Sequence, residues 1–211
     1  MARGVFISFE GSEGCGKSTQ IQRLAERLRE RGHRVLLTRE PGGTEIGEHL
    51  RHLLQHSKAG HTMTPETELL LFTASRAQLV REVIAPALAE GAIVVADRFL
   101  DSTTVYQGVA RKLDVSQVAA INGFAVGEVL PQITFVLDLD PEVARRRMRQ
   151  RTLAFDRMES QPDAFYEAVR AGYLALAKAH PARVRLVDGA EPVEPIAARI
   201  WEQLDPLLPP R

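Results

Sequence analysis

A stretch near the N-terminus has the residue types and the spacing of a phosphate-binding loop. Residues 11–18 read Gly-Ser-Glu-Gly-Cys-Gly-Lys-Ser, which fits the pattern G-x-x-x-x-G-K-[ST]. Its glycines allow the backbone to turn successive N–H groups inward around an anion. Lys17 supplies a positive charge for the β- and γ-phosphates, and the Ser18 hydroxyl is a ligand for Mg²⁺. The stretch therefore predicts a binding site for a nucleoside triphosphate and its magnesium ion.

The sequence on both sides of this loop has the context that the motif requires. Residues 4–9 form a short apolar run typical of a buried strand, and an amphipathic helix is predicted from about residue 17. The single cysteine, Cys15, cannot form an intrachain disulfide, and we expect it to be a small filler in the loop. We expect the triphosphate to be bound by the loop and the residue after it: Gly11, Ser12, Glu13, Gly14, Cys15, Gly16, Lys17, Ser18 and Thr19.

Two further segments carry charged side chains where predicted strands end. Asp97 and Arg98 follow the apolar run 92–96, and a carboxylate in that position is typical of a second magnesium ligand, directly or through water. The alternative is a structural ion pair between these two neighbours. Arg39 begins the turn 39–43, Arg-Glu-Pro-Gly-Gly, after another predicted strand. Ligands gather at the carboxyl ends of parallel strands, so we expect Arg39 to contact phosphate or substrate.

Residues 145–151 read Arg-Arg-Arg-Met-Arg-Gln-Arg, and Arg157 follows. A charged run is usually a solvated helix face, but here arginines of like charge crowd one face, which an anionic ligand would offset. We therefore expect a lid, at about residues 145–158, that closes over the triphosphate.

Phe72 and Arg76 are four residues apart on a predicted helix and share a face. Phe72 alone would be interpreted as core packing, but the pair suits a nucleobase. His49, His52 and His56 also recur at helical spacing. No further ligand accompanies them, and we expect an exposed face rather than a metal site.

The elements that position these residues alternate between strand and helix. Strands are predicted at 4–9, 34–38, 92–96, 133–137 and 183–187, with a long helix over 65–90 and a broken helical stretch over 102–127. This alternation predicts an α/β fold with a five-stranded parallel sheet between layers of helices. We expect one continuous domain over residues 1–211, with the lid as its only appendage.

The composition is that of an ordinary globular protein. Apolar residues make up 45% of the chain and charged residues 26%, and the formal net charge is zero. A zero net charge argues against a dedicated surface for nucleic acid or for an anionic membrane. The N-terminus lacks the pattern of a signal peptide, and we expect a cytoplasmic enzyme.

Taken together, the motifs resemble those of thymidylate kinases of the bacterial type, within the P-loop nucleoside monophosphate kinases. The matching segments span most of the chain: residues 9–19, 38–43, 71–76, 97–98, 101–103, 106–108 and 156–157. The resemblance implies the three-layer P-loop NTPase fold, transfer of a phosphoryl group from ATP to dTMP, and a homodimer. Family members in eukaryotes carry an arginine where this chain has Gly14, so the catalytic arginine should come from the lid. We favour Arg149 and Arg151 over Arg147, beside Lys17 and Asp97.

The same resemblance implies a role for each residue of the dTMP site. Phe72 would stack on thymine, Arg76 would donate to its carbonyl edge, and Thr103 and Gln107 would lie against the base. Tyr106 would crowd the 2′ position of the sugar. The dTMP site implied in this way consists of Glu13, Arg39, Phe72, Arg76, Arg98, Thr103, Tyr106 and Gln107.

Two other functions remain possible on sequence grounds. Another P-loop kinase could act on a different nucleotide or on a nucleoside, whose neutral hydroxyl would need a base such as Glu40 or Asp97. A nucleotide-dependent switch is less favoured, because the sequence contains no N-K-x-D or D-x-x-G element.

Overall fold

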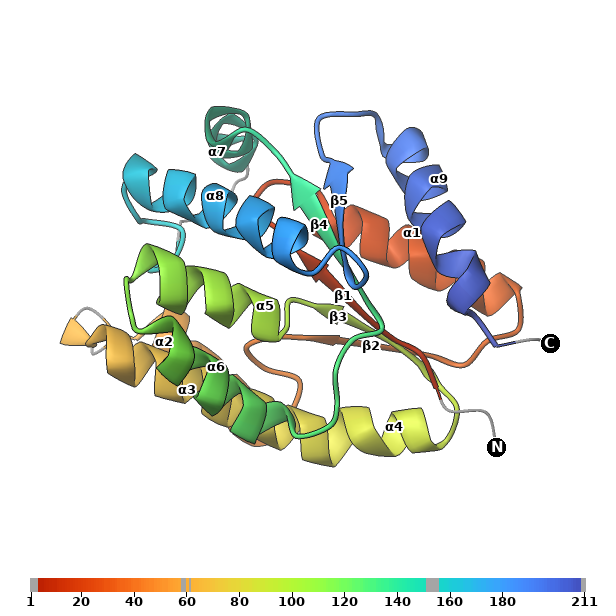
Figure 1. Cartoon of the computed structure of the whole chain (residues 1–211), viewed down its shortest axis with the longest axis horizontal. Helices are drawn as coiled ribbons and strands as arrows, with labels where there is room; N and C mark the ends of the chain where they lie inside the picture. Colours follow the sequence, from red (N-terminus) through yellow and green to blue (C-terminus); the bar gives the residue numbers. More distant parts are fainter. Residues whose placement is uncertain (1–3, 58–59, 61, 151–155, 210–211) are drawn as a thin grey trace.

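Five parallel strands form one central sheet in the computed structural model, which describes residues 4–57, 60, 62–150 and 156–209. The strands are β1 (Phe6–Glu10), β2 (Val35–Arg39), β3 (Ile93–Asp97), β4 (Ile133–Asp138) and β5 (Val184–Asp188). Their order is β2-β3-β1-β4-β5, so the strand with the phosphate-binding loop lies in the middle (Figure 1). The predicted strands are confirmed, with ends shifted by one or two residues.

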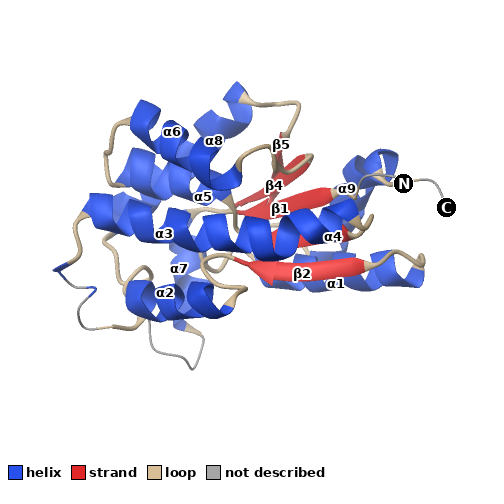
Figure 2. Cartoon of the chain, turned by 90° about the horizontal axis from the view of Figure 1, so that it is seen from below, coloured by secondary structure: helices blue, strands red, loops and turns tan. Residues whose placement is uncertain are grey.

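Helices cover both faces of the sheet and give three layers. On one face, α1 (Lys17–Glu30) and α9 (Val193–Leu204) pack on alternate side chains of the strands, such as Ile7 and Phe9 of β1. On the other face lie α3 (Pro65–Leu79), α4 (Ala85–Ala89) and α8 (Asp163–Ala179). Figure 2 shows this second layer from below. The predicted three-layer α/β fold is confirmed.

Two predicted helical stretches each contain a π-helical segment. The long helix predicted over 65–90 is continuous, with residues Val80–Ile84 in π geometry between α3 and α4. The broken stretch predicted over 102–127 consists of α5 (Leu100–Thr103), the π-helical turn Thr104–Ala110 and α6 (Val115–Val126). Such single π turns often occur at functional sites because they re-aim side chains.

The remaining helices lie at the carboxyl edge of the sheet. Thr44 caps α2 (Glu45–Gln55) by accepting a hydrogen bond from the Gly47 N–H. Asp140 caps α7 (Pro141–Arg149) in the same way. Residues 151–155 of the expected lid lie outside the described residues. Among the helices that the structure describes, none combines the length and the apolar character needed to cross a membrane.

Candidate active site

The loop after β1 has the backbone of an anion cradle. Gly11, Gly14 and Gly16 have φ angles of 128°, 78° and 99°, a region that other residues rarely adopt. A Cβ on Gly14 would lie 2.6 Å from the carbonyl oxygen of Ala144 in α7, so the loop has no room for a side chain there. The helix α1 begins at Lys17 and adds its N-terminal N–H groups to the cradle.

Lys17 curls back over this loop. Its ammonium group donates to the carbonyl oxygens of Gly11 at 3.2 Å and Ser12 at 3.0 Å, and lies 4.0 Å from the carboxylate of Glu13. A triphosphate in the cradle would therefore meet a lysine that is already held at its edge. Cys15 is buried in the apolar cluster under α1, as expected for a filler.

Two hard oxygen ligands meet beside Lys17. The Ser18 hydroxyl lies 3.4 Å from Oδ2 of Asp97 at the end of β3. This donor set fits Mg²⁺, which is usually held by one or two protein oxygens together with substrate phosphates and water. Among the described residues, no group of three or more His, Cys, Asp or Glu side chains could hold a metal by itself. His49, His52 and His56 are all exposed.

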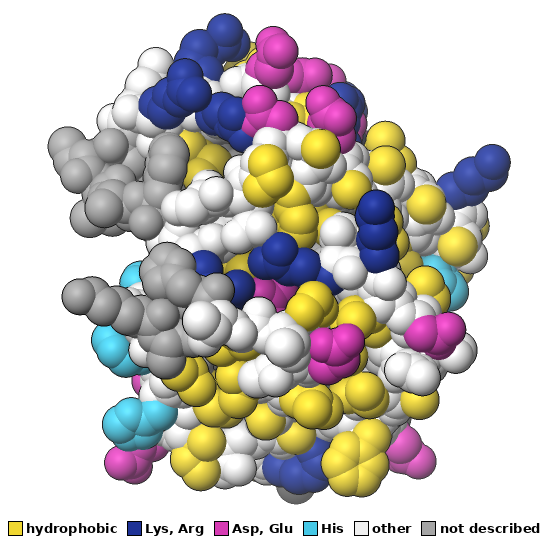
Figure 3. All heavy atoms as spheres, turned by 90° about the vertical axis from the view of Figure 1, so that its left-hand side faces the viewer, with side chains coloured by type: hydrophobic (Ala, Val, Ile, Leu, Met, Phe, Trp, Pro, Cys, Tyr) yellow, Lys and Arg dark blue, Asp and Glu magenta, His cyan; other side chains and the backbone are white. Residues whose placement is uncertain are grey.

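A cavity of about 270 Å³ opens next to the loop, at the carboxyl edge of the sheet. Figure 3 looks at this side of the molecule, where Lys and Arg side chains lie across the middle of the face. The structure brings all eight residues expected for dTMP to the wall of this one cavity: Glu13, Arg39, Phe72, Arg76, Arg98, Thr103, Tyr106 and Gln107. They come from six separate segments of the chain.

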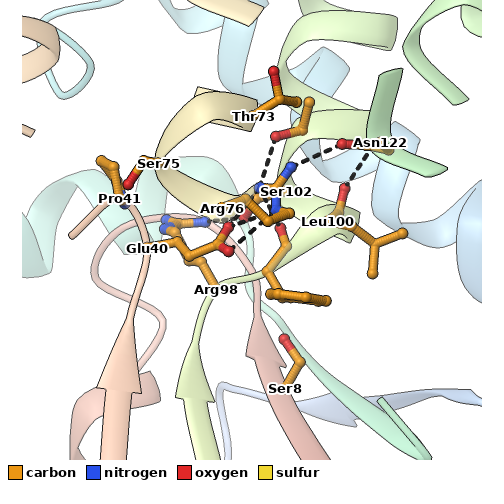
Figure 4. Close-up of polar contacts among 12 residues, drawn as sticks. Ser8, Glu40, Pro41, Thr73, Ser75, Arg76, Arg98, Leu100, Ser102 and Asn122 are labelled. Atoms are coloured by element: carbon orange, nitrogen blue, oxygen red, sulfur yellow. Dashed lines mark hydrogen bonds and ion pairs between the residues drawn. The ribbon is translucent and has the colours of Figure 1, made fainter. Parts of the chain in front are cut away.

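Arg76 is held at the base of this cavity by an ion pair with Glu40 (Figure 4). Its Nε lies 3.1 and 2.8 Å from the two oxygens of Glu40. Its two Nη groups donate to Asn122, to Thr103 and to the carbonyl oxygen of Phe99. Burial raises the pKa of Glu40 to about 7, because the loss of hydration outweighs the attraction of Arg76. Sequence reasoning considered Glu40 only as a possible base and missed this partnership.

Arg98 is presented to the cavity from a strained backbone. Its φ is 73°, which is uncommon for a residue with a side chain and often marks a functional position. The guanidinium forms an ion pair with Glu13 at 2.5 Å. Among the described contacts, none joins it to the adjacent Asp97. It also donates to the hydroxyls of Ser102 at 3.0 Å and Tyr106 at 3.3 Å. The alternative of an Asp97–Arg98 pair is therefore replaced by a pair across the cavity.

A buried carboxylate supports Arg98 from below. Glu10, at the end of β1, accepts hydrogen bonds from Ser102 at 2.5 Å and from the Tyr173 hydroxyl at 2.8 Å. Both hydroxyls also contact the Arg98 guanidinium. Burial, reinforced by the negative charge of Asp101, raises the pKa of Glu10. The hydroxyls of Ser102 and Tyr173 thus connect a buried acid to an arginine in the cavity.

Comparisons with known proteins agree with this geometry. The sequence model of one family, described as thymidylate kinase, matches residues 9–200. A thymidylate kinase of Geobacter sulfurreducens is 47% identical over 99% of this chain and 100% of its own length. The chain belongs to the thymidylate kinase family. A thymidylate kinase of Synechococcus sp. (strain JA-3-3Ab) is 48% identical over 97% of both chains.

A solved structure extends the likeness to the fold. The crystal structure of a thymidylate kinase from Ehrlichia chaffeensis is 34% identical, with a TM-score of 0.77 over 96% of this chain and 99% of that one. The chain is therefore an enzyme of the thymidylate kinase family, and its cavity is the candidate acceptor site of a kinase.

The described arginines of α7 include one that lines the thymidylate kinase site. Arg147 lines the cavity and donates to the carbonyl oxygen of Gly189 at 3.1 Å. Arg149 is exposed and lines a second cavity of about 520 Å³ between the loop, α7 and the start of α8. Arg151 lies outside the described residues. The structure thus adds Arg147, which sequence reasoning disfavoured, to the candidates for the catalytic arginine, whereas Arg149 and Arg151 stay predictions.

Sequence reasoning missed several residues of the cavity wall. Arg51 and Gln55 lie four residues apart on α2, and both face the cavity. Arg51 donates to the carbonyl oxygen of Pro41 at 3.0 Å, and burial together with repulsion from Arg39 lowers its pKa. The spacing of Arg51 and Gln55 on one helix face is a signal that could have found them. Ser102 and Met158 also line the cavity.

Proposed function

We propose that this enzyme transfers the γ-phosphoryl group of ATP to dTMP, giving ADP and dTDP for the synthesis of dTTP. The observation that carries this proposal is the single cavity in which a triphosphate loop meets an aromatic ring and an arginine, Phe72 and Arg76. ATP would bind through the loop residues 11–19, and dTMP would fill the rest of the cavity. The two nucleotides would then meet at Lys17 with their phosphates facing each other.

The acceptor needs no general base. A phosphate monoester has a second pKa of about 6 and is mostly a dianion at neutral pH. Catalysis then consists of positioning the two phosphates and neutralising the charge that builds between them. Lys17 supplies one positive charge at the loop, and Arg39 and Arg98 would hold the acceptor phosphate. Arg39 is paired with Glu48 at 3.0 Å on the exposed rim, so it can turn to a ligand at little cost.

Magnesium is the cofactor that the site suits. Ser18 and Asp97 would hold the ion, Asp97 directly or through water, and the ion would neutralise phosphate charge. Asp97 would act as a catalytic residue, because an ion held there would lie next to the reacting phosphates.

The remaining roles concern the nucleoside. Phe72 would stack on the base, with Thr103 and Gln107 against its edge. Tyr106 would lie at the 2′ position, and Glu13 at the 3′-hydroxyl. Burial raises the pKa of Tyr106 well above its usual value, so its hydroxyl stays neutral. The lid, over about residues 145–158 of a single domain, would contribute Arg149 and Arg151 to the transferred phosphoryl group, with Arg147 beside them.

A homodimer in the cytoplasm is the proposed state of the enzyme. Several large apolar side chains are exposed on α3, on the π-helical turn and on α6: Leu70, Val109, Val115 and Phe124. Apolar side chains gather in the lower part of the face in Figure 3. Exposed apolar patches mark interaction surfaces, and a second copy of this chain would cover this one.

The test is formation of ADP with a panel of acceptors: dTMP, dUMP, dCMP and thymidine. The expected result is rapid turnover of dTMP, weaker turnover of dUMP and little with thymidine. Faster turnover of thymidine than of dTMP would overturn the proposal in favour of a nucleoside kinase. Steady ATP hydrolysis without any acceptor would favour a nucleotide-dependent switch.

A further inference from the structure

Gln107 lies in the wall of the cavity with its side-chain amide already engaged. It belongs to the π-helical turn Thr104–Ala110, and its side chain is buried. Its Nε2 donates to Oε1 of Glu68 at 2.8 Å. Because one end of the amide is committed to Glu68, the group that remains for a ligand in the cavity is the amide oxygen. No group among the described residues donates to that oxygen.

Glu68 leaves the amide no other orientation. Arg111 donates to both Glu68 oxygens, at 3.1 and 3.2 Å, and Arg157 lies 2.6 Å from Oε2. Burial would raise the pKa of Glu68, but the hydrogen bonds from Arg111 and Gln107 outweigh it and keep the pKa low. An ionised carboxylate only accepts hydrogen bonds. Gln107 must therefore turn its NH₂ group to Glu68 and its carbonyl oxygen away from it.

Arg76 lines the same cavity and offers hydrogen-bond donors, the opposite polarity to the Gln107 oxygen. A guanidinium has five N–H donors. The Nε donor goes to Glu40, and the two Nη2 donors go to Glu40, Thr103 and Phe99. Nη1 donates to Asn122 (Figure 4). Of the two N–H groups on Nη1, one is thus left for a ligand. The cavity thus offers a base one donor from Arg76 and one acceptor from Gln107.

That pair of groups matches a pyrimidine with a carbonyl at C4 and a hydrogen on N3. Thymine and uracil have this edge, with O4 as an acceptor and N3–H as a donor. Cytosine has the reverse, with an amino group at C4 and an unprotonated N3. Its amino group would face the guanidinium of Arg76, and its N3 would face the oxygen of Gln107. Unpaired polar groups of this kind allow a site to discriminate strongly.

We infer that Glu68 is a positioning residue that sets base selectivity, because it fixes the amide of Gln107 so that the cavity accepts 4-oxo and rejects 4-amino pyrimidine nucleotides. Glu68 acts through Gln107 and does not touch the base. The inference rests on the proposed function, since it requires the base to lie against Arg76 and Gln107.

The test is the ratio of kcat/KM for dTMP to kcat/KM for dCMP in Glu68→Gln. The amide of the glutamine has one oxygen where the carboxylate of Glu68 had two. It can therefore accept hydrogen bonds either at the position of Oε1, which faces Gln107, or at the position of Oε2, which faces Arg157. The Oε2 side meets two fixed donors, Nη2 of Arg111 and Arg157, whereas the Oε1 side meets only one, Nε of Arg111, beside Gln107, which can rotate its amide. We therefore expect the new NH₂ group to face Gln107, which would turn its own NH₂ into the cavity. The ratio should fall by about tenfold or more, and the KM for ATP should stay unchanged.

A double-mutant cycle separates this role from general support of the fold. Gln107→Met removes the amide at similar size and should lower the ratio by itself. In that background Glu68→Gln should have no further effect on the ratio. An additive further loss would overturn the inference, as would an unchanged ratio in Glu68→Gln alone. If Gln107→Met itself leaves the ratio unchanged, the proposed place of the base fails, and this inference with it.

Two more variants complete the experiment. Asp101→Asn is the matched control, because Asp101 is also buried and is paired with both Nη groups of Arg183. It should lose stability without any change in the ratio; a change there as large as in Glu68→Gln would count against a specific role. Glu68→Asp keeps the negative charge but shortens the side chain by one methylene, which loosens its hold on the Gln107 amide. It should also lower the ratio, and an unchanged ratio in a folded Glu68→Asp protein would contradict the inference.

Discussion

Arg76 and Glu40 form an ion pair whose side chains are only 1% and 2% exposed, at the base of the acceptor cavity. Such a pair contributes little net stability, but removing one partner leaves an uncompensated buried charge and typically costs about 3–5 kcal/mol. The pair joins the end of β2 to α3, and it fixes the guanidinium where a base would lie. A ligand therefore meets Arg76 in one orientation, with few donors left to offer.

The raised pKa of Glu40 predicts a pH dependence of stability. The folded protein holds this proton up to about pH 7, whereas the unfolded chain releases it near 4.5. Between these values the folded state binds more protons, so the free energy of unfolding should fall as the pH rises, by up to about 1.4 kcal/mol per pH unit. Denaturant unfolding between pH 5 and 8 should show this slope in the wild type and a smaller one in Glu40→Gln, where the raised pKa of Glu10 still contributes.

The control for this experiment is Glu48→Gln. A hydrogen bond from the Gly43 N–H lowers the pKa of Glu48, so Glu48 titrates below the range measured. Its stability curve should run parallel to that of the wild type between pH 5 and 8. An equal slope in Glu40→Gln and the wild type would show that Glu40 does not titrate in this range.

Lys17→Ala should reduce turnover to a small residual level. The lysine is the positive charge held at the edge of the loop, and loss of one preorganised charge-stabilising group costs about 10²–10³-fold in kcat. Formation of ADP with saturating dTMP measures the loss. Lys178→Ala, on the exposed side of α8, is the control and should keep full activity. Substantial turnover by a folded Lys17→Ala enzyme would contradict the assigned role.

The arginine-rich segment should affect kcat more than binding. We expect Arg149→Ala and Arg151→Ala to lower kcat, on the order of 10³-fold for the arginine that contacts the transferred group, with a smaller effect on the KM for dTMP. Arg147→Ala tests the candidate that the structure adds. Arg146→Ala, exposed on the same helix, is the control. An unchanged kcat would remove the arginine concerned from the catalytic role.

Phe72→Ala should weaken the binding of dTMP. Stacking of a base on an aromatic ring contributes about 1–3 kcal/mol, which corresponds to a rise in KM of about 5- to 150-fold. The KM for ATP should not change. Leu71→Ala changes the neighbouring residue of α3, which does not line the cavity, and should leave both values alone. Equal effects of the two substitutions would mean that Phe72 only packs in the core.

Phe124→Arg should disrupt the proposed dimer. Phe124 is 82% exposed on α6, and an arginine at the centre of an apolar contact would bury an unpaired charge. Light scattering after size-exclusion chromatography should change from a dimer to a monomer. Leu186→Arg, on the exposed edge of β5, is the control and should stay dimeric. A wild-type protein that is already monomeric would refute the proposal outright.

Local patterns in the sequence were sufficient to predict the fold and part of the site. Alternating apolar runs and caps such as Thr44 and Asp140 act over a few residues, so they predict elements and their order well. The spacing of residues in the phosphate-binding motif was sufficient to predict that Lys17 and Ser18 lie at the site. The strand ends differ by a residue or two because hydrogen bonding to neighbouring strands, and not the local pattern, decides where pairing stops.

Other parts of the site could not be predicted in this way. Glu68 gathers Gln107, Arg111 and Arg157 from segments that are far apart in the chain, and no local motif marks such a convergence. The π-helical turn Thr104–Ala110 has no distinctive composition, yet it decides which side chains reach the cavity. Arg76 was predicted to meet a ligand, but its pairing with Glu40 depends on a contact across 36 positions.

The close approach of α7 to Gly14 has a consequence for engineering. Because the carbonyl oxygen of Ala144 lies 2.6 Å from where a Cβ on Gly14 would be, an arginine does not fit at position 14 without a shift of α7. Such a substitution would first require α7 to move away, and α7 itself carries Arg145, Arg146, Arg147 and Arg149. An arginine at position 14 is therefore sterically incompatible with α7 in its present place.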